Sequence, residues 1–148
     1  MELLLKSGQS GVTKQPLILA VDDDEDNLLL LTEVLSPMSC SFITATSGQA
    51  VLMLAQDYHP DLILLDAMLP DVSGIEVIHH LRQNPQTKTI PVIAVTALAR
   101  AEDRERLLAA GCNDYISKPY MLEDLEAIIH RYLSLTPFVA QYEQGKEE

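Results

Sequence analysis

Chemically active side chains stand at the ends of four apolar runs in this 148-residue chain. They are Asp22 and Asp23 after the first run, Asp66 after the third, Thr96 after the fourth and Lys118 after the fifth. Three carboxylates at close range are costly to keep ionised without a counter-charge. Mg²⁺ supplies one, because it takes oxygen ligands and keeps waters and phosphate oxygens in its remaining positions. Since a carboxylate can also act as a nucleophile and form an acyl phosphate, the set suits Mg²⁺-dependent phosphoryl transfer to an aspartate.

Lys118 and Thr96 complete this chemistry. Phosphoryl transfer depends mainly on in-line positioning and on neutralising charge at the equatorial phosphoryl oxygens, which an ammonium and a hydroxyl can serve. Taken alone, Asp66 would as readily cap its strand or the next helix, and Thr96 would be an ordinary strand-end hydroxyl. Their shared position at strand ends is what favours a common site.

The elements that must position these residues follow from the apolar pattern. Short aliphatic runs, typical of strands buried on both faces, alternate with segments of helical periodicity. The expected strands are residues 17–21, 41–45, 62–65, 91–95 and 114–116, and the expected helices are residues 26–35, 48–57, 74–82, 99–110 and 121–133. This alternation predicts a doubly wound α/β domain with a five-stranded parallel sheet and five helices. In the flavodoxin-like strand order 2-1-3-4-5, the carboxyl ends of the first and third strands flank the ligand crevice, so the active residues meet in one pocket.

Several residues mark the expected helix ends. Asp26 or Asn27 is available as the N-cap of the first helix, and His59-Pro60 ends the second. Gly111 closes the fourth helix as a left-handed residue. The remaining acids of the run Asp22 to Asp26 are expected to be solvated or helix-capping, not additional metal ligands.

Composition restricts the function class. A chain of this length forms one domain, and its net charge of −12 argues against nucleic-acid binding, which needs clustered Lys and Arg. No apolar run approaches the roughly 20 residues that a membrane helix needs, and the start does not resemble a signal peptide. Cys40 and Cys112 lack metal-ligand spacing and are expected to be reduced core residues. These features predict a cytoplasmic protein with a leader at 1–15, a domain at 16–133 and a tail at 134–148.

The span from Pro16 to Leu133 resembles the receiver domain of two-component response regulators. The matching pieces are Val21-Asp22-Asp23-Asp24, Asp61 to Asp66, Leu69-Pro70 with Gly74, Thr96-Ala97, Ala110-Gly111-Cys112 with Tyr115, and Lys118-Pro119. The resemblance implies that a histidine kinase or phosphotransfer protein phosphorylates Asp66. It also implies a signalling switch and not an enzyme, one that catalyses only its own phosphorylation and slow dephosphorylation.

The same resemblance assigns the other roles. Asp22 and Asp23 would hold Mg²⁺, or another divalent cation such as Mn²⁺, together with Asp66 and the backbone carbonyl of Met68. Thr96 and Tyr115 would form the switch pair that reorients on phosphorylation. Lys118 would contact the phosphoryl group, and the Lys118-Pro119 peptide would be cis.

The output of such a receiver passes through a partner protein. We expect a free-standing receiver, with a receiver cut from a hybrid kinase as the alternative, and no binding to nucleic acid or membrane. The expected partner surface is the face of the fourth helix, fifth strand and fifth helix. It would include Arg100, Arg104, Tyr115, Tyr120 and Met121. Homodimerisation on phosphorylation is common in the family and is left open.

Two further positions concern the lifetime of the acyl phosphate. Met68 and Leu98, two residues after Asp66 and Thr96, flank the phosphoryl group in the family. Because both are apolar, we expect them to shield it from water and to slow self-dephosphorylation. The alternative is that both side chains point away from the site.

Two rival functions fit the same residues. A phosphoaspartyl hydrolase of the haloacid dehalogenase type also uses strand-end carboxylates and Mg²⁺, but its nucleophile lies in an Asp-x-Asp element at the first strand. Asp22 to Asp24 contains that element, although acids continue it. A degenerate receiver that only binds partners is disfavoured by the complete set of pocket residues. The pair His79-His80 is expected to be a surface feature of the third helix.

Overall fold

The structure, a computed structural model, describes residues 15–97 and 100–133. Strands and helices alternate along these residues. The strands are β1 Leu17–Val21, β2 Ser41–Ala45, β3 Leu62–Leu65, β4 Val92–Thr96 and β5 Asp114–Ser117, and the helices are α2 Glu25–Leu35, α3 Gly48–Tyr58, α4 Gly74–Gln83, α5 Ala101–Ala110 and α6 Leu122–Tyr132. Residues 1–14 of the predicted leader (1–15), Leu98 and Ala99, and the predicted tail at residues 134–148 lie outside the described residues.

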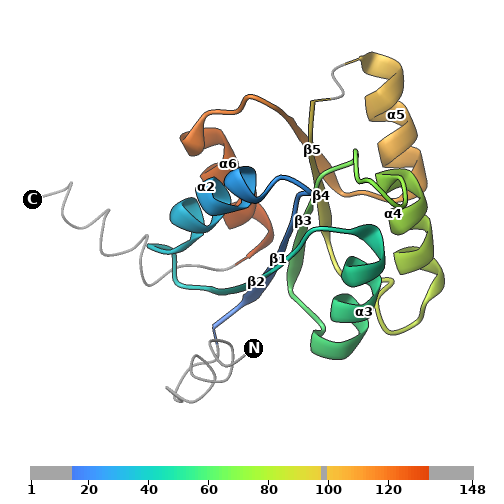
Figure 1. Ribbon diagram of the computed structural model, residues 1–148, viewed down its shortest axis with the longest axis horizontal. Helices are drawn as coiled ribbons and strands as arrows, with labels where there is room; N and C mark the ends of the chain where they lie inside the picture. The colour runs from blue at the N-terminus through green and yellow to red at the C-terminus, as the bar shows by residue number, and fades with distance from the viewer. Residues whose placement is uncertain (1–14, 98–99, 134–148) are drawn as a thin grey trace, which may run out of the picture.

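The five strands form one parallel sheet in the order β2-β1-β3-β4-β5. Helices α2 and α6 cover one face of the sheet, and α3, α4 and α5 cover the other (Figure 1). The predicted fold class, a doubly wound α/β domain of flavodoxin-like order, is therefore confirmed. All strands end on the same side, which is the arrangement that brings the strand-end residues together.

The central strands β1 and β3 are apolar throughout because both faces of the sheet are covered. Successive side chains nevertheless serve different cores. Ile18 and Ala20 of β1 pack in the cluster under α2 and α6, whereas Leu19 and Val21 pack in the cluster under α3, α4 and α5. This alternation with a period of two follows from the geometry of the strand, in which successive side chains point to opposite faces.

The helix ends explain small shifts from the predicted boundaries. The N-cap of α2 is Asp24, whose carboxylate accepts the Asp26 N–H at 2.8 Å, so the predicted cap at Asp26 or Asn27 is wrong. The reason is that Asp24 has the extended backbone that a cap requires, whereas Asp26 already lies in the first turn. His59 and Gly111 end α3 and α5 with positive φ angles of 50° and 121°.

Cys40 and Cys112 are both buried and free, as expected. Burial raises the pKa of each thiol to about 11. Both thiols therefore stay protonated at neutral pH, which fits packing roles and not metal or redox chemistry. Within the described residues, no helix has the length and apolar character needed to cross a membrane.

Candidate functional site

Asp22 enters the site because β1 ends one residue before it. Its backbone N–H donates to the carbonyl of Ala45, which extends the β1–β2 pairing by one residue and fixes where the side chain points. Only 2% of Asp22 is exposed, and its Oδ1 accepts the N–H of Asp24 at 2.9 Å. Asp23, next in the chain, is exposed. One carboxylate thus lies inside the site and a second lies at its mouth.

Asp66 has the equivalent position after β3. Its N–H donates to the carbonyl of Val21 at 3.1 Å, and 6% of the residue is exposed. The N–H of Met68 donates to Oδ1 of Asp66 at 2.9 Å, which turns the chain away from the sheet. The Oδ2 atom remains directed toward the groups that follow β5.

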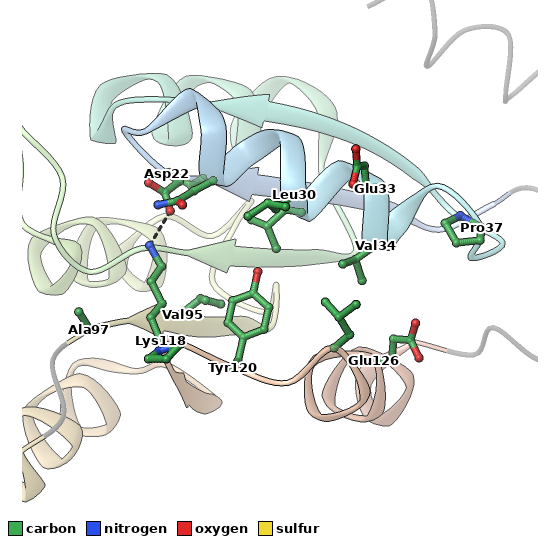
Figure 2. A pocket seen from close by; sticks show the side chains of 15 residues that line it. Asp22, Leu30, Glu33, Val34, Pro37, Val95, Ala97, Lys118, Tyr120 and Glu126 are labelled. Carbon is green, nitrogen blue, oxygen red and sulfur yellow. Dashed lines mark hydrogen bonds and ion pairs between the residues drawn. The ribbon is translucent and has the colours of Figure 1, made fainter.

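Lys118 joins the two buried carboxylates. Its Nζ lies 2.6 Å from Oδ2 of Asp22 and 3.1 Å from Oδ2 of Asp66. The Lys118–Pro119 peptide is cis, as the resemblance implied, and the N–H of Lys118 donates to the carbonyl of Thr96. Figure 2 shows the lysine side chain reaching from its strand end toward Asp22. Residues 96 positions apart in the chain are therefore in direct contact.

Three carboxylates gather at this edge in a way that suits a divalent cation. One oxygen from each of Asp22, Asp23 and Asp66 lies within 4.8 Å of the others. Carboxylate oxygens are hard ligands of the kind that Mg²⁺ and Mn²⁺ prefer. The exposure of Asp23 leaves one side open to water. The donor set fits an ion that binds through a few protein oxygens and retains waters.

The site holds more buried carboxylates than ammonium groups to pair with them. Burial raises the pKa of Asp66 above its ordinary value, and the N–H of Met68 and the ammonium of Lys118 offset only part of that effect. Burial would lower the pKa of Lys118, but its hydrogen bonds with Asp22 and Asp66 outweigh burial and raise it. One ammonium thus serves two buried carboxylates. A bound cation would supply the charge that the site lacks.

Thr96 and Tyr115 lie on neighbouring strands beside this pocket. Thr96 is fully buried at the end of β4 and pairs in register with Ser117 of β5. The Ser117 hydroxyl donates to the Tyr115 hydroxyl oxygen at 3.2 Å. The guanidinium of Arg104 lies 5.0 Å from the centre of the Tyr115 ring, on the side of α5. Tyr115 is thus placed between the strand that carries Thr96 and the surface of α5.

The other residues singled out from the sequence divide into two groups. Arg100 and Arg104 are exposed near the start of α5, and Met121 is exposed before α6. Tyr120, which the sequence assigned to the same surface, instead lines a groove between α2 and α6 (Figure 2). His79 and His80 are exposed on α4, as expected.

The groove between α2 and α6 opens directly beside the carboxylates. It has a volume of about 730 Å³, and Asp22 and Lys118 form its inner end. Leu30 of α2 and Leu122 of α6 also line it, with 58% and 56% of each residue exposed. The site is therefore continuous with a mainly apolar surface.

Sequence reasoning missed one residue at this edge, Asp71. Its carboxylate accepts the N–H groups of Gly48 and Gln49, which belong to α3 and not to its own loop. The sequence showed only an aspartate in a turn after Pro70. Its role could not be read from the sequence, because the hydrogen bonds form only when the loop after β3 lies against the start of α3.

The chain matches the family model of the response regulator receiver domain over residues 18–130. DivK of Brucella ovis, a polar-differentiation response regulator, is 41% identical over 116 residues, which cover 78% of this chain and 94% of DivK.

Two solved structures illustrate the structural similarity. The chemotaxis response regulator CheY4 of Vibrio cholerae has a TM-score of 0.76 and 27% identity, covering 80% of this chain and 99% of CheY4. The receiver domain of the sensor histidine kinase PA1611 from Pseudomonas aeruginosa has a TM-score of 0.74 and 30% identity, covering 80% and 97% of the two chains. That structure holds a magnesium ion coordinated in the active-site cleft.

Proposed function

The chain belongs to the response regulator receiver family, a family of signalling switches, and we propose that its switch is Mg²⁺-dependent phosphorylation of Asp66. The observation that carries the proposal is the position of the Asp66 carboxylate. It lies at a strand end, in contact with Lys118 and within one cluster with Asp22 and Asp23. The phosphodonor is a histidine kinase or a phosphotransfer protein, the partners with which receivers of this family interact.

The residues present fit the metal ion that the family binds. Asp22, Asp23 and Asp66 would hold Mg²⁺ or Mn²⁺ directly or through water, with the backbone carbonyl of Met68 as a further oxygen ligand. When bound, the ion neutralises charge on the phosphoryl oxygens. The magnesium ion in the cleft of the PA1611 receiver supports this assignment.

The chain's own residues then divide the reaction among them. A carboxylate oxygen of Asp66 attacks the phosphorus of the donor, the P–N bond of a phosphohistidine breaks, and its electron pair stays on the imidazole nitrogen. The ammonium of Lys118, already in contact with Asp66 at 3.1 Å, neutralises the incoming phosphoryl group. The hydroxyl of Thr96 serves a second phosphoryl oxygen.

Phosphorylation is transmitted through Thr96 and Tyr115. If Thr96 reorients toward the phosphoryl group, the space beside Tyr115 changes, and with it the ring contact to Arg104 on α5. The output surface then comprises α5, β5 and the start of α6, with Arg100, Arg104, Tyr115 and Met121. NMR of the protein with beryllofluoride as a phosphoryl analogue would test this, and an unchanged Tyr115 ring environment would contradict it.

The groove between α2 and α6 is proposed as the docking site for the phosphodonor protein. Any donor that delivers a phosphoryl group to Asp66 must contact this edge, and the groove is continuous with it through Asp22 and Lys118. Its exposed lining residues Leu30 and Leu122 offer apolar area for a protein interface. A small phosphodonor would not need this contact.

The rival hydrolase function is disfavoured by the position of Asp24. A hydrolase of the haloacid dehalogenase type needs both carboxylates of its Asp-x-Asp element in the site. The carboxylate of Asp24 instead caps α2 by accepting the N–H of Asp26. The degenerate receiver is disfavoured because the carboxylates, the hydroxyl and the lysine are all present.

One experiment tests the central proposal. The purified protein is incubated with Mg²⁺ and acetyl phosphate, and its intact mass is measured. We expect a gain of one phosphoryl group that is lost in Asp66→Asn and on chelation of the metal. Phosphorylation that persists in Asp66→Asn, or no gain in the wild type, would overturn the proposal.

A further inference from the structure

One carboxylate links two segments that the chain separates by more than 20 positions. Oδ1 of Asp71 accepts the N–H of Gly48 at 2.8 Å, and Oδ2 accepts the N–H of Gln49 at 3.1 Å. The next amide of α3, that of Ala50, donates to the Ser47 hydroxyl at 3.2 Å. The free N–H groups at the start of α3 are therefore shared between a local cap and a distant loop.

The two segments approach closely because Gly48 has no side chain. A Cβ at that position would lie 3.0 Å from Cβ of Val72 and 3.0 Å from a methyl carbon of Val77. The hydrogen bonds from Gly48 and Gln49 hold the pKa of the Asp71 carboxyl below its ordinary value. Asp71 is thus a carboxylate at neutral pH, and its bonds are charge-assisted.

The loop that Asp71 holds is the one that begins at Asp66. Its first part is fixed by the Met68 N–H, which donates to Oδ1 of Asp66. Its two ends meet where the Gly74 N–H donates to the Ala67 carbonyl at 2.9 Å. A Cβ on Gly74 would lie 2.5 Å from Cα of Ala67, so this closure requires glycine. Between these points, the carboxylate of Asp71 provides the hydrogen bonds from the loop to α3.

We propose that Asp71 is a positioning residue for the metal site, which holds the loop against α3 so that the Met68 carbonyl faces the carboxylate cluster. The inference rests on the proposed function, because it takes the Met68 carbonyl as a metal ligand. Asp71 itself acts through the loop and touches neither the ion nor the phosphoryl group. Changing a group that orients a metal ligand lowers metal affinity. Because Asp71 does not contact the phosphoryl group, we expect its effect in Mg²⁺ binding and not in the rate at saturating Mg²⁺.

The test variant is Asp71→Ala, with Asp71→Asn as a second variant that keeps an acceptor for Gly48. We expect the dissociation constant of Mg²⁺, measured by isothermal titration calorimetry, to rise roughly three- to tenfold in Asp71→Ala. Phosphorylation by acetyl phosphate should require correspondingly more Mg²⁺ but reach a rate close to that of the wild type at saturation. A melting curve of each variant confirms that it is folded.

Two control variants separate positioning from other effects. Ser47→Ala removes the local cap of the same helix and leaves the loop contact intact, so it should lower the melting temperature without changing Mg²⁺ affinity. Glu25→Gln removes one exposed negative charge near the start of α2, at the same edge of the sheet, and measures the effect of charge alone.

The outcomes are distinct. Wild-type affinity in Asp71→Ala and Asp71→Asn, or an equal loss in Ser47→Ala or Glu25→Gln, would overturn the role of Asp71 while leaving phosphorylation of Asp66 intact. A lower rate at saturating Mg²⁺ with unchanged affinity would also contradict it. If the wild type neither binds Mg²⁺ nor accepts a phosphoryl group, the proposed function itself fails.

Discussion

Two partly buried cations hold opposite ends of the sheet, and their partners differ. Lys118, at the carboxyl ends of the strands, lies between two carboxylates, those of Asp22 and Asp66. Arg82, in the last turn of α4, donates instead to neutral oxygens. These are the backbone carbonyls of Lys88, Ile90 and Gly111 and the side-chain oxygen of Asn113.

The difference separates the edge proposed for phosphoryl transfer, the reactive edge, from a structural edge around Arg82. The acceptors of Arg82 lie in the segments that lead into β4 and β5, and Asn113 also accepts the N–H of Val92 at the start of β4. The N–H donors of Arg82 are matched by neutral acceptors. The guanidinium therefore holds the loops together and does not neutralise a buried carboxylate. At Lys118 one ammonium faces two buried carboxylates, and the site keeps an excess of negative charge. A divalent cation can neutralise that excess, and the cation and Lys118 together would then offset the negative charge of an incoming phosphoryl group.

The largest effect is expected from Lys118→Met, which removes the ammonium between Asp22 and Asp66. We expect phosphorylation by acetyl phosphate at saturating Mg²⁺ to slow roughly a hundredfold, because one stabilising cation at the phosphoryl oxygens is lost. Without metal, the variant should also unfold at a lower temperature, since Asp22 and Asp66 are left buried and unpaired. Mg²⁺ should restore more stability to the variant than to the wild type.

The matched control for this change is Lys88→Met, which removes an exposed lysine side chain. It should leave the rate and the metal dependence of melting unchanged. A Lys118→Met protein that is phosphorylated at the wild-type rate would show that the two carboxylates do not depend on this cation.

At the other edge, Arg82→Met should affect stability and not chemistry. The change removes hydrogen bonds to several partly buried oxygens, and we expect a loss of about 2–4 kcal/mol in the free energy of unfolding, measured with urea. The phosphorylation rate per folded molecule should be unchanged. Arg106→Met, an exposed arginine on α5, is the control and should be close to neutral. A strong loss of phosphorylation in folded Arg82→Met would remove the distinction between the two edges.

The clustering of the carboxylates and Lys118 was predictable from the sequence, and the hydrogen-bond network around Arg82 was not. Strand-end residues such as Asp66 and Lys118 are marked by the apolar runs before them, and parallel topology then brings them together. Arg82 carries no such mark, because most of its acceptors are backbone carbonyls that every residue has. Asp71 was missed for a related reason, since its partners are backbone N–H groups of α3.

The N-cap of α2 was also not predictable from residue types alone. The sequence offered a run of acids from Asp22 to Asp26, each of them able to cap a helix. Which one does so depends on the backbone angles after β1, where Asp24 is extended. Tyr120 was likewise assigned to the surface of α5, β5 and α6, whereas it packs against the core cluster under α2 and α6 and lines the groove.

If the groove between α2 and α6 is the docking site, changes in its lining should affect protein phosphodonors and not small ones. Leu30→Ser and Leu122→Ser should each slow transfer from a phosphotransfer protein that phosphorylates the wild type, by about tenfold, because exposed apolar area at an interface is lost. Phosphorylation by acetyl phosphate should be unaffected. Met53→Ser, with 62% exposure on α3, is a matched surface change and should not affect either donor. Equal transfer rates in all three variants would place the docking surface elsewhere.

The smallest expected effect concerns how long the reactive edge keeps its phosphoryl group. Met68 follows Asp66 by two residues, and 56% of it is exposed, so its side chain is available to cover the phosphoryl group from the solvent side. Met68→Gln replaces this apolar cover with a group that can bind water, and hydrolysis of the acyl phosphate should accelerate roughly threefold. The half-life is measured by intact mass after removal of the donor, with Met53→Gln as control. An unchanged half-life in Met68→Gln would show that the side chain points away from the site, because neither the backbone carbonyl nor the charges of the pocket change in this variant.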